Sequence, residues 1–275
     1  MKRVGSFLIL FLFGMLVFFV GGYWTGIQGW QRTAVKIVIP ALLLLGTIAA
    51  GRSKSLRKWR TIFLGFLAAS TAFLVSHLVS GWLLGLTGMS TESVPGIAFA
   101  KLFDALPIVI TILAVARLGG LKPTDLYIRR GRMKVWLIVG LISFAAFTIL
   151  FLFQASGEGI GAERLIAFAP WTLIFVFANA FMEELHFRGL LLGPFEELLG
   201  SHTANLCIAF FFTLTHAPVQ YTPDILLFLV LVFALSYAWG YIMQKTESIW
   251  GSVLFHAGAD LMIVVGIYQT YGADV

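Results

Sequence analysis

The sequence predicts an all-α polytopic membrane protein, a bundle of eight to nine transmembrane helices. Of its 275 residues, 59% are hydrophobic and only 12% are charged, and the mean hydropathy is +0.93. A soluble domain carries about a quarter charged residues. Apolar runs approach or exceed about 20 residues, the length that crosses a bilayer as a helix. They lie at 5–24, 34–50, 61–87, 97–117, 134–153, 168–192, 203–217, 224–244 and 248–268.

The first apolar run follows two cations and has the charge pattern of a signal peptide. No small-residue cleavage site follows this run, and the stretch 21–24 (GGYW) suits an anchor at the membrane surface. We therefore expect a retained first helix.

Lysine and arginine collect in alternate loops, and short positively charged loops stay in the cytoplasm. The basic segments are 2–3, 52–60 and 117–134. The intervening segments 25–33, 88–96 and 154–167 hold only two cations, Arg32 and Arg164. We therefore expect a cytoplasmic N-terminus. Most of the cations behind the net charge of +6 lie in short loops next to the membrane, where they set the orientation of the protein. The expected partner of these cytoplasmic loops is therefore anionic lipid and not nucleic acid.

The run at 168–192 contains the stretch NAFMEELHFRGLLL, in which charged residues interrupt apolar ones. Residues four apart share a helical face, so Asn179 aligns with Glu183, and Glu184 aligns with Arg188. An intrahelical ion pair between Glu184 and Arg188 accounts for two charges and leaves Glu183 unexplained. An ionisable residue within a span costs about 2.5–3.5 kcal/mol on insertion. Glu183 is therefore a candidate functional residue.

Two later runs supply acid and base groups. His216 ends the segment Phe212-Thr-Leu-Thr-His216, and His256 and Asp260 share a helical face. Counted from the expected cytoplasmic ends, Glu183 lies about 14 Å deep and His256 about 12 Å. His216 lies about 20 Å deep and Asp260 about 18 Å. We expect the four groups in one layer that is open to the cytoplasmic side.

Such a set of groups suits amide hydrolysis without a covalent nucleophile. A carboxylate and a neutral imidazole aimed at a common point can deprotonate a water molecule. A second imidazole and its neighbour can donate hydrogen bonds to the developing oxyanion. Arg188 can hold a carboxylate in its ionised form or bind an incoming one.

Three motifs in this region resemble those of a known family. They are Glu-Glu-x-x-x-Arg at Glu183, Glu184 and Arg188, Phe-x-x-x-His at Phe212 and His216, and His-x-x-x-Asn/Asp at His256 and Asp260. In this order they resemble the CAAX-processing and bacteriocin-immunity (CPBP, or Abi) family, and its type II CAAX prenyl endopeptidases in particular. The resemblance implies an intramembrane protease with a conical chamber open to the cytosol. It further implies that Glu183 and His216 activate water, while His256 and residue 260 stabilise the oxyanion.

One position departs from the family pattern. The prenyl endopeptidases have asparagine where this chain has Asp260, and an ionised aspartate cannot donate a hydrogen bond. Asp260 must therefore be protonated, orient His256 or have another role. The change opens a zinc alternative, with ligands drawn from Glu183, His216, His256 and Asp260. The glutamate mechanism without a cofactor is favoured, because no His-Glu-x-x-His pair is present.

The polar stretch 154–164 marks the expected seam of the chain. Residues 1–153 are expected to form transmembrane helices of unassigned role, and residues 154–275 a catalytic helical core. The resemblance implies a membrane-associated protein or peptide as substrate, whether prenylated or not. We expect a multi-pass protein of a prokaryotic plasma membrane, with the active site open to the cytosol.

Two other classes also place polar residues at mid-depth. A proton-coupled transporter usually shows internal repeats and interrupted helices in matching positions, which are not seen here. A non-catalytic scaffold or immunity protein would use the polar groups for helix packing alone. We apply this packing interpretation to His77, His186 and His202, which are expected to make interhelical hydrogen bonds. Lys101 and Asp104, three residues apart, are expected to form an ion pair.

Overall fold

The computed structural model describes residues 2–24, 26–218 and 224–272, and these contain helices and no strand. Helix α1 (Lys2–Gly14) runs into the π-helix η1 (Met15–Tyr23). The next four are α2 (Gly29–Arg52), α3 (Arg60–Gly85), α4 (Val94–Leu118) and α5 (Met133–Gly157). One continuous segment then comprises α6 (Ala162–Glu183), the π-helix η4 (Glu184–Gly189) and α7 (Leu190–Leu199). The last three are α8 (Ser201–Thr215), α9 (Ile225–Thr246) and α10 (Trp250–Tyr271).

Each of the nine predicted apolar runs coincides with one of these helical segments. Within the described ranges, eight segments are long and apolar enough to cross a membrane, which confirms a multi-pass membrane protein. The exception is α8, whose 15 residues rise only about 22 Å. Because α8 is short, the residue that follows it, His216, does not reach the far side of the bundle.

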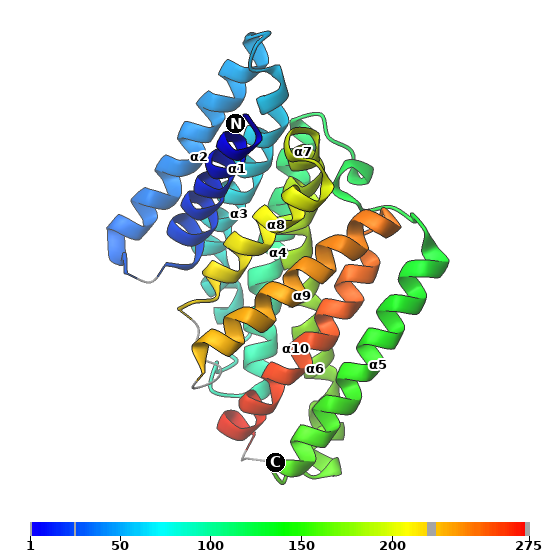
Figure 1. Cartoon of the computed structure of the whole chain (residues 1–275). Coiled ribbons are helices and arrows are strands. Elements are labelled where there is room, and N and C mark those ends of the chain that lie inside the picture. The colour runs from blue at the N-terminus through cyan, green and yellow to red at the C-terminus, as the bar shows by residue number, and fades with distance from the viewer. Residues whose placement is uncertain (1, 25, 219–223, 273–275) are drawn as a thin grey trace.

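Local sequence signals set several helix ends. Ser93 caps α4, its hydroxyl accepting a hydrogen bond from the Gly96 amide at 3.2 Å, as an N-cap residue does. Asp224 caps α9 in the same way through the Leu227 amide at 3.0 Å. Glu247 ends α9 in the left-handed conformation, with φ of 54°. The chain therefore turns at once into α10, which lies beside α9 (Figure 1).

The packing order places the C-terminal helices next to one another. α3 lies between α2 and α4, and α4 packs on α6. α10 packs on α5, α6 and α9, and α8 packs on α9 and α1. Figure 1 shows α5 at one edge of the bundle, beside α10, with α1 to α3 at the opposite edge. The helices that carry the candidate residues thus lie in the middle of the molecule.

Three histidines expected to serve packing make interhelical hydrogen bonds, which confirms that prediction. Their partners, at 2.9–3.0 Å, are the Thr33 hydroxyl for His77, the Ala69 carbonyl for His186 and the Tyr237 hydroxyl for His202. The expected ion pair between Lys101 and Asp104 is wrong: in the described chain no carboxylate oxygen lies within 4.0 Å of the Lys101 ammonium. Asp104 instead accepts a hydrogen bond from Ser76 of α3 at 3.1 Å.

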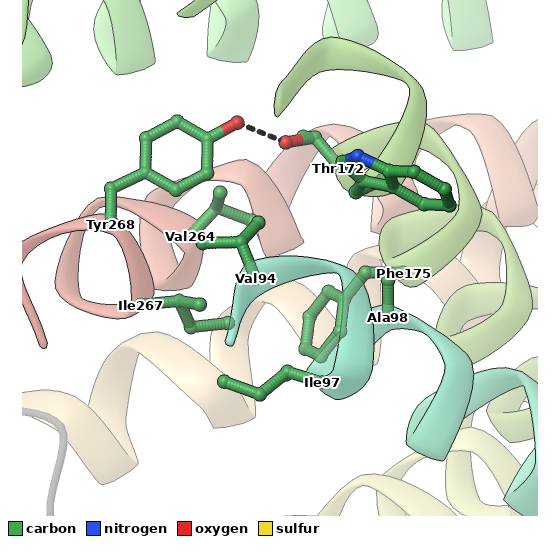
Figure 2. Close-up of a pocket in the computed structure, with 9 residues that line it drawn as sticks. Val94, Ile97, Ala98, Thr172, Phe175, Val264, Ile267 and Tyr268 are labelled. Atoms are coloured by element: carbon green, nitrogen blue, oxygen red, sulfur yellow. Dashed lines mark hydrogen bonds between the residues drawn. The ribbon is translucent and has the colours of Figure 1, made fainter. Parts of the chain in front are cut away.

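A small space of about 10 Å³ lies where α4, α6 and α10 meet, away from the candidate residues (Figure 2). Its walls are apolar apart from Thr172 and Tyr268, whose hydroxyls are hydrogen-bonded to each other. The space has room for about one water molecule. It is a packing feature of the bundle.

Candidate active site

A cavity of about 510 Å³ brings together residues of α4, α6, α8, α9 and α10. The ionisable side chains on its wall are Lys101, Glu183, His216, His256 and Asp260. Most of the remaining wall is apolar and aromatic. The four candidate groups from three motifs therefore do face one common space, as the depth estimate predicted.

The π-helix η4 separates the two neighbouring glutamates. Glu183 is the last residue of α6, and Glu184 is the first of the six residues of η4. Short π-helical insertions occur frequently at functional sites. The sequence-based assumption of an unbroken α-helix through this stretch is therefore wrong. Glu183 lines the cavity, whereas Glu184 and Arg188 are completely buried behind it.

Arg188 compensates the charge of Glu184. Its Nη1 lies 3.0 Å from Glu184 Oε1, which confirms the predicted intrahelical ion pair. Its Nη2 donates to the hydroxyl and, at 3.2 Å, to the carbonyl of Ser236 on α9. The guanidinium lies 4.3 Å from the ring centroid of Phe212 and 5.5 Å from that of Trp239, within cation–π range. Arg188 thus ties η4 to α8 and α9 and does not face the cavity.

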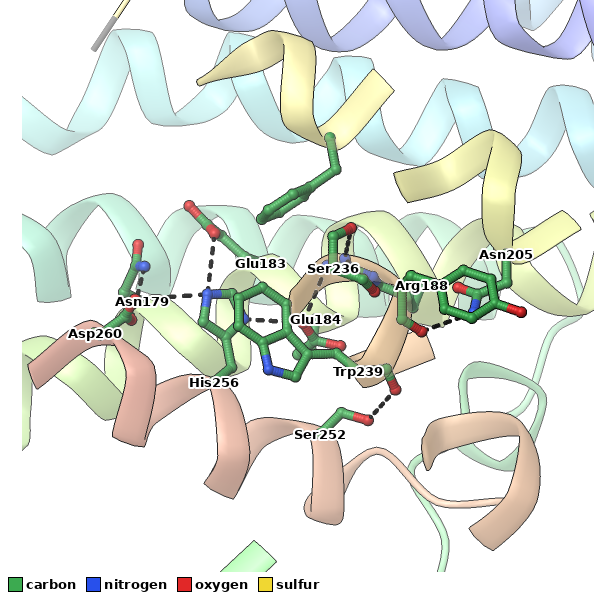
Figure 3. Close-up of polar contacts among 12 residues, drawn as sticks. Asn179, Glu183, Glu184, Arg188, Asn205, Ser236, Trp239, Ser252, His256 and Asp260 are labelled. Carbon is green, nitrogen blue, oxygen red and sulfur yellow. Dashed lines mark hydrogen bonds and ion pairs between the residues drawn. The ribbon is translucent and has the colours of Figure 1, made fainter. Parts of the chain in front are cut away.

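His256 lies at the centre of the polar contacts (Figure 3). Its Nδ1 is 2.9 Å from Glu184 Oε1, and because an ionised carboxylate only accepts, Nδ1 carries the hydrogen. Its Nε2 lies 3.5 Å from Glu183 Oε2 and 3.6 Å from Asp260 Oδ1. The ring stacks on Trp239 with centroids 3.7 Å apart and planes 9° apart. Both the hydrogen bond and the stacking hold the imidazole in one orientation.

Asp260 is engaged with Asn179 on the facing helix. Asn179 Nδ2 donates to Asp260 Oδ2 at 3.0 Å, while Asp260 Oδ1 faces His256 (Figure 3). Asn179 and Glu183 lie one helical turn apart on α6, but the hydrogen bond of Asn179 crosses to Asp260 on α10. An amide and a carboxylate stand side by side on the cavity wall.

His216 presents one nitrogen to the protein backbone. Its Nδ1 lies 2.9 Å from the Phe212 carbonyl oxygen, which can only accept, so Nδ1 carries the hydrogen. Nε2 then keeps its lone pair as an acceptor. The Phe212 ring lies 4.6 Å from the His216 ring and 6.2 Å from the His256 ring, measured between centroids. Phe212 therefore packs between the two histidines and Arg188.

The zinc alternative requires three of the four candidate side chains to converge on one ion. Among residues 2–24, 26–218 and 224–272, no three His, Cys, Asp or Glu side chains are grouped so that they could hold a metal ion. Nδ1 of His256 and Oδ2 of Asp260 have protein hydrogen-bond partners. A mechanism without a cofactor stays a prediction, which the Discussion tests.

Two residues of α9 belong to this arrangement and were missed in the sequence. Trp239 stacks on His256, and Ser236 binds Arg188. Neither is ionisable, so no charge in the apolar run of α9 distinguishes them. The signal that points to this helix is the pair of small residues Ser236 and Gly240, four apart, a spacing typical of close contacts between membrane helices.

Comparison with known proteins gives one match. Residues 165–262 match a protein-family model described as Type II CAAX prenyl endopeptidase Rce1-like. The matched segment contains every candidate residue from Asn179 to Asp260, and it confirms the resemblance carried by the three motifs. The curated proteins and the solved structures give no match.

Proposed function

We propose a specific reaction for this chain, because residues 165–262 match the family model described as Type II CAAX prenyl endopeptidase Rce1-like, a family of CAAX protease-type enzymes. The protein is an intramembrane endopeptidase that hydrolyses a peptide bond of a membrane-associated protein without a cofactor. One observation carries this proposal: Glu183, His216, His256 and Asp260, from three separate helical segments, line one cavity.

Glu183 and His216 activate the attacking water in this proposal. Glu183 Oε2 is buried and accepts no hydrogen bond from the described protein, so it is free to accept one from water. His216 Nε2 is the second acceptor in the same cavity. The Glu183 carboxylate takes a proton as the water oxygen bonds to the scissile carbonyl carbon. The C–N bond then breaks as Glu183 returns the proton to the leaving amine. The products are a carboxylic acid and an amine, and transfer of the acid proton to the amine leaves a carboxylate and an ammonium.

Asn179 and His256 donate to the oxyanion in this proposal. An ionised Asp260 has no hydrogen to donate, but it holds the Asn179 amide through Nδ2 at 3.0 Å. The same nitrogen has a second N–H, for which no partner occurs in the described chain. His256, once its Nε2 is protonated, is the other donor. Asp260 is then a positioning residue, and Asn179 supplies the amide that the family pattern has at position 260.

The apolar wall of the cavity favours substrates with apolar groups next to the scissile bond. Phe147, Phe175, Leu235 and Met262 surround the polar groups, so apolar side chains or a lipid chain next to the scissile bond would be buried on binding. The proposed location is a prokaryotic plasma membrane. The cavity extends from Glu183 and His256 toward Tyr23 and Phe228, at the end of the bundle opposite the basic loop 52–60. The substrate is therefore a membrane-associated protein or peptide with apolar residues at the cleavage site.

Profiling of new protein termini tests the activity. Membranes from the source cells are incubated with purified wild type, with Glu183→Gln or with Glu197→Gln. Glu197 is an exposed glutamate of α7, so it receives the same chemical change outside the cavity. We expect new termini with wild type and Glu197→Gln and none with Glu183→Gln. The residues next to those termini identify the substrate class, and a lipid attached nearby shows whether it is prenylated.

Identical termini in all three samples, with folded protein in each, would contradict hydrolysis at this cavity. A scaffold or immunity protein predicts that Glu183→Gln also retains its biological function. A proton-coupled transporter predicts that uptake into vesicles, and not the set of termini, depends on Glu183.

A further inference from the structure

A second cavity, of about 350 Å³, lies among η1, α2, α3 and α4. Apart from Met182, its lining residues lie outside the matched segment 165–262. It adjoins the candidate active site, because Tyr23 and Lys101 line both cavities. Its charged and hydroxyl-bearing lining residues include Arg32, Lys36, Ser76, Ser80, Lys101 and Asp104.

The charges in this α2–α4 cavity are unbalanced. Three cations face one carboxylate, and that carboxylate, Asp104, accepts a hydrogen bond from Ser76 at 3.1 Å. No carboxylate lies within 4.0 Å of the Arg32, Lys36 or Lys101 nitrogens in the part of the chain that the structure describes. Cations in membrane helices are costly and usually have a partner. The missing partner is an anion.

The three cations have few partners, and the partners they have are neutral groups. Lys36 Nζ donates to the Gly21 carbonyl oxygen at 2.6 Å, which leaves its other two hydrogens free. Arg32 Nε is buried and has no hydrogen-bond partner in the described chain. Lys101 Nζ lies 5.7 Å from the ring centroid of Phe175, a cation–π contact that adds no negative charge. Several N–H donors therefore remain for a ligand.

Exposed tryptophans indicate the depth of this cavity in the membrane. Trp24, Trp30 and Trp82 are exposed and lie near the same end of the bundle, where α2 begins and α3 ends. Tryptophan is enriched at the membrane–water interface. Arg32 and Lys36 follow Trp30 within two helical turns. The cations therefore lie at and just below the level of the lipid headgroups, from which their long side chains can reach the phosphates.

The surface next to the cavity suits acyl chains. Asp104 and His77 are exposed at the cavity, so it opens on the surface of the bundle. Large apolar side chains lie exposed on the same three helices, including Ile37 of α2, Leu78 of α3 and Ile110 of α4. A ligand with one anionic group and a long apolar part matches both features.

We propose that the α2–α4 cavity binds the phosphate group of an anionic phospholipid, with Arg32, Lys36 and Lys101 contacting the phosphate oxygens. Guanidinium and ammonium groups are the usual partners of phosphate, and the arginine fork can bind two oxygens at once. This site lies at the opposite end of the bundle from the basic loop 52–60 and does not depend on the proposed hydrolysis.

Lipid binding by the purified full-length protein tests the proposal. The protein is titrated separately with dioleoyl phosphatidylglycerol and with dioleoyl phosphatidylcholine, which have the same acyl chains. Native mass spectrometry counts the lipid molecules bound to each protein molecule. The variants are Arg32→Gln/Lys101→Gln and the control Arg52→Gln/Arg57→Gln, which removes the same charge from the basic loop. We expect wild type and the control to prefer phosphatidylglycerol by at least about tenfold, and the cavity variant to lose this preference.

Competition experiments distinguish a lipid phosphate from a free anion or a peptide carboxylate in the cavity. Inorganic phosphate should not displace the lipid at equal concentration, because it lacks the apolar part. Equal affinity of inorganic phosphate would show a solute-anion site, and displacement by a short peptide with a free C-terminal carboxylate would show a substrate site. Either result would overturn the lipid assignment, as would an unchanged preference in the cavity variant.

A measurement on wild type keeps the test independent of variant folding. Phosphatidylglycerol with a photoreactive group close to its phosphate is crosslinked to the protein in a bilayer, and the labelled peptides are identified. Label on the α2 and α4 segments that carry Arg32 and Lys101 is expected. Label confined to other segments would contradict the site.

Discussion

Two adjacent glutamates have opposite roles at the residue scale. Glu184 is fully buried between Arg188 and His256, whereas Glu183 lines the cavity. Removing one partner of a buried ion pair costs about 3–5 kcal/mol, because the other charge stays buried without compensation. Glu184→Gln should therefore lower the free energy of unfolding by about that amount, measured by thermal or denaturant unfolding in detergent. Glu197→Gln is the exposed control, and equal unfolding of both variants would contradict this role.

The amide of Asn179 gives a second prediction at this scale. Removing an oxyanion donor costs about 10²–10³ in kcat, so Asn179→Ala should lower kcat by that factor and leave KM and the fold unchanged. Asp260→Asn keeps a carbonyl oxygen that accepts from Asn179, and it should retain activity within about tenfold of wild type. The two variants are compared with one peptide substrate. The opposite ranking, with Asn179→Ala near wild type and Asp260→Asn more active, would assign the donor to position 260.

The arrangement of donor atoms leads to a prediction about metals. Since no described group of three ligand side chains could hold a metal ion, proteolysis should persist after treatment with chelators such as 1,10-phenanthroline. Elemental analysis of the active protein should find zinc far below stoichiometric amounts. Stoichiometric zinc whose removal and return abolish and restore activity would establish the zinc alternative.

The ionisable residues of the candidate site could be found in the sequence, because charges in apolar runs are conspicuous and helix depth follows from counting. The sequence did not reveal which of these side chains contact each other across helices. Asn179 was aligned with Glu183 by helical periodicity, but it contacts Asp260 on another helix. That contact depends on how α6 and α10 are rotated against each other. Trp239 was missed because an aromatic residue in a membrane helix looks like any other packing residue.

At the scale of elements, α8 and α9 approach closely at Gly240. A Cβ added to Gly240 would overlap the side chain of Asn205, which is buried and donates to the Tyr237 carbonyl at 2.8 Å. A Cβ added to Gly266 of α10 would meet nothing within 4 Å. Both changes to alanine gain helix propensity, so the pair isolates the effect of crowding.

We expect Gly240→Ala to destabilise the protein by about 1–3 kcal/mol relative to Gly266→Ala. The measurement is unfolding of both purified variants under the same conditions. Because α8 ends next to His216, Gly240→Ala should also reduce activity more than Gly266→Ala does. Equal stability of the two variants would show that α8 and α9 can separate without cost.

The nine helical segments were predictable, because a transmembrane helix can be recognised from the length and apolar composition of its sequence alone. The two π-helices η1 and η4 were not. A π-turn changes the direction of side chains without changing composition, and apolar residues surround both segments. In η4 the change from α-helix to π-helix falls between Glu183 and Glu184.

At the scale of the whole molecule, the expected seam at 154–164 falls between α5 and α6. However, α5 packs along α10 and α4 packs on α6, so helices from either side of the seam interleave. Order along the chain could not reveal this, because packing between membrane helices depends on surface shape and not on distance in sequence. Segments before the seam therefore supply walls of the candidate site, through Tyr23 of η1, Lys101 of α4 and Phe147 of α5.

The distribution of basic loops predicts the orientation of the whole bundle. The loop around 52–60 carries five cations, Arg52, Lys54, Arg57, Lys58 and Arg60, whereas the segment 88–96 carries none. Short basic loops stay in the cytoplasm. The N-terminus should therefore face the cytosol.

Cysteine labelling in intact cells can check this orientation, because the chain has a single cysteine, the buried Cys207. In a Cys207→Ala background, Ser55→Cys and Thr91→Cys each place one thiol at an exposed position at opposite ends of α3. A membrane-impermeant maleimide should label Thr91→Cys in intact cells and Ser55→Cys only after the membrane is opened. The reverse pattern would contradict the expected orientation and place the N-terminus outside the cell.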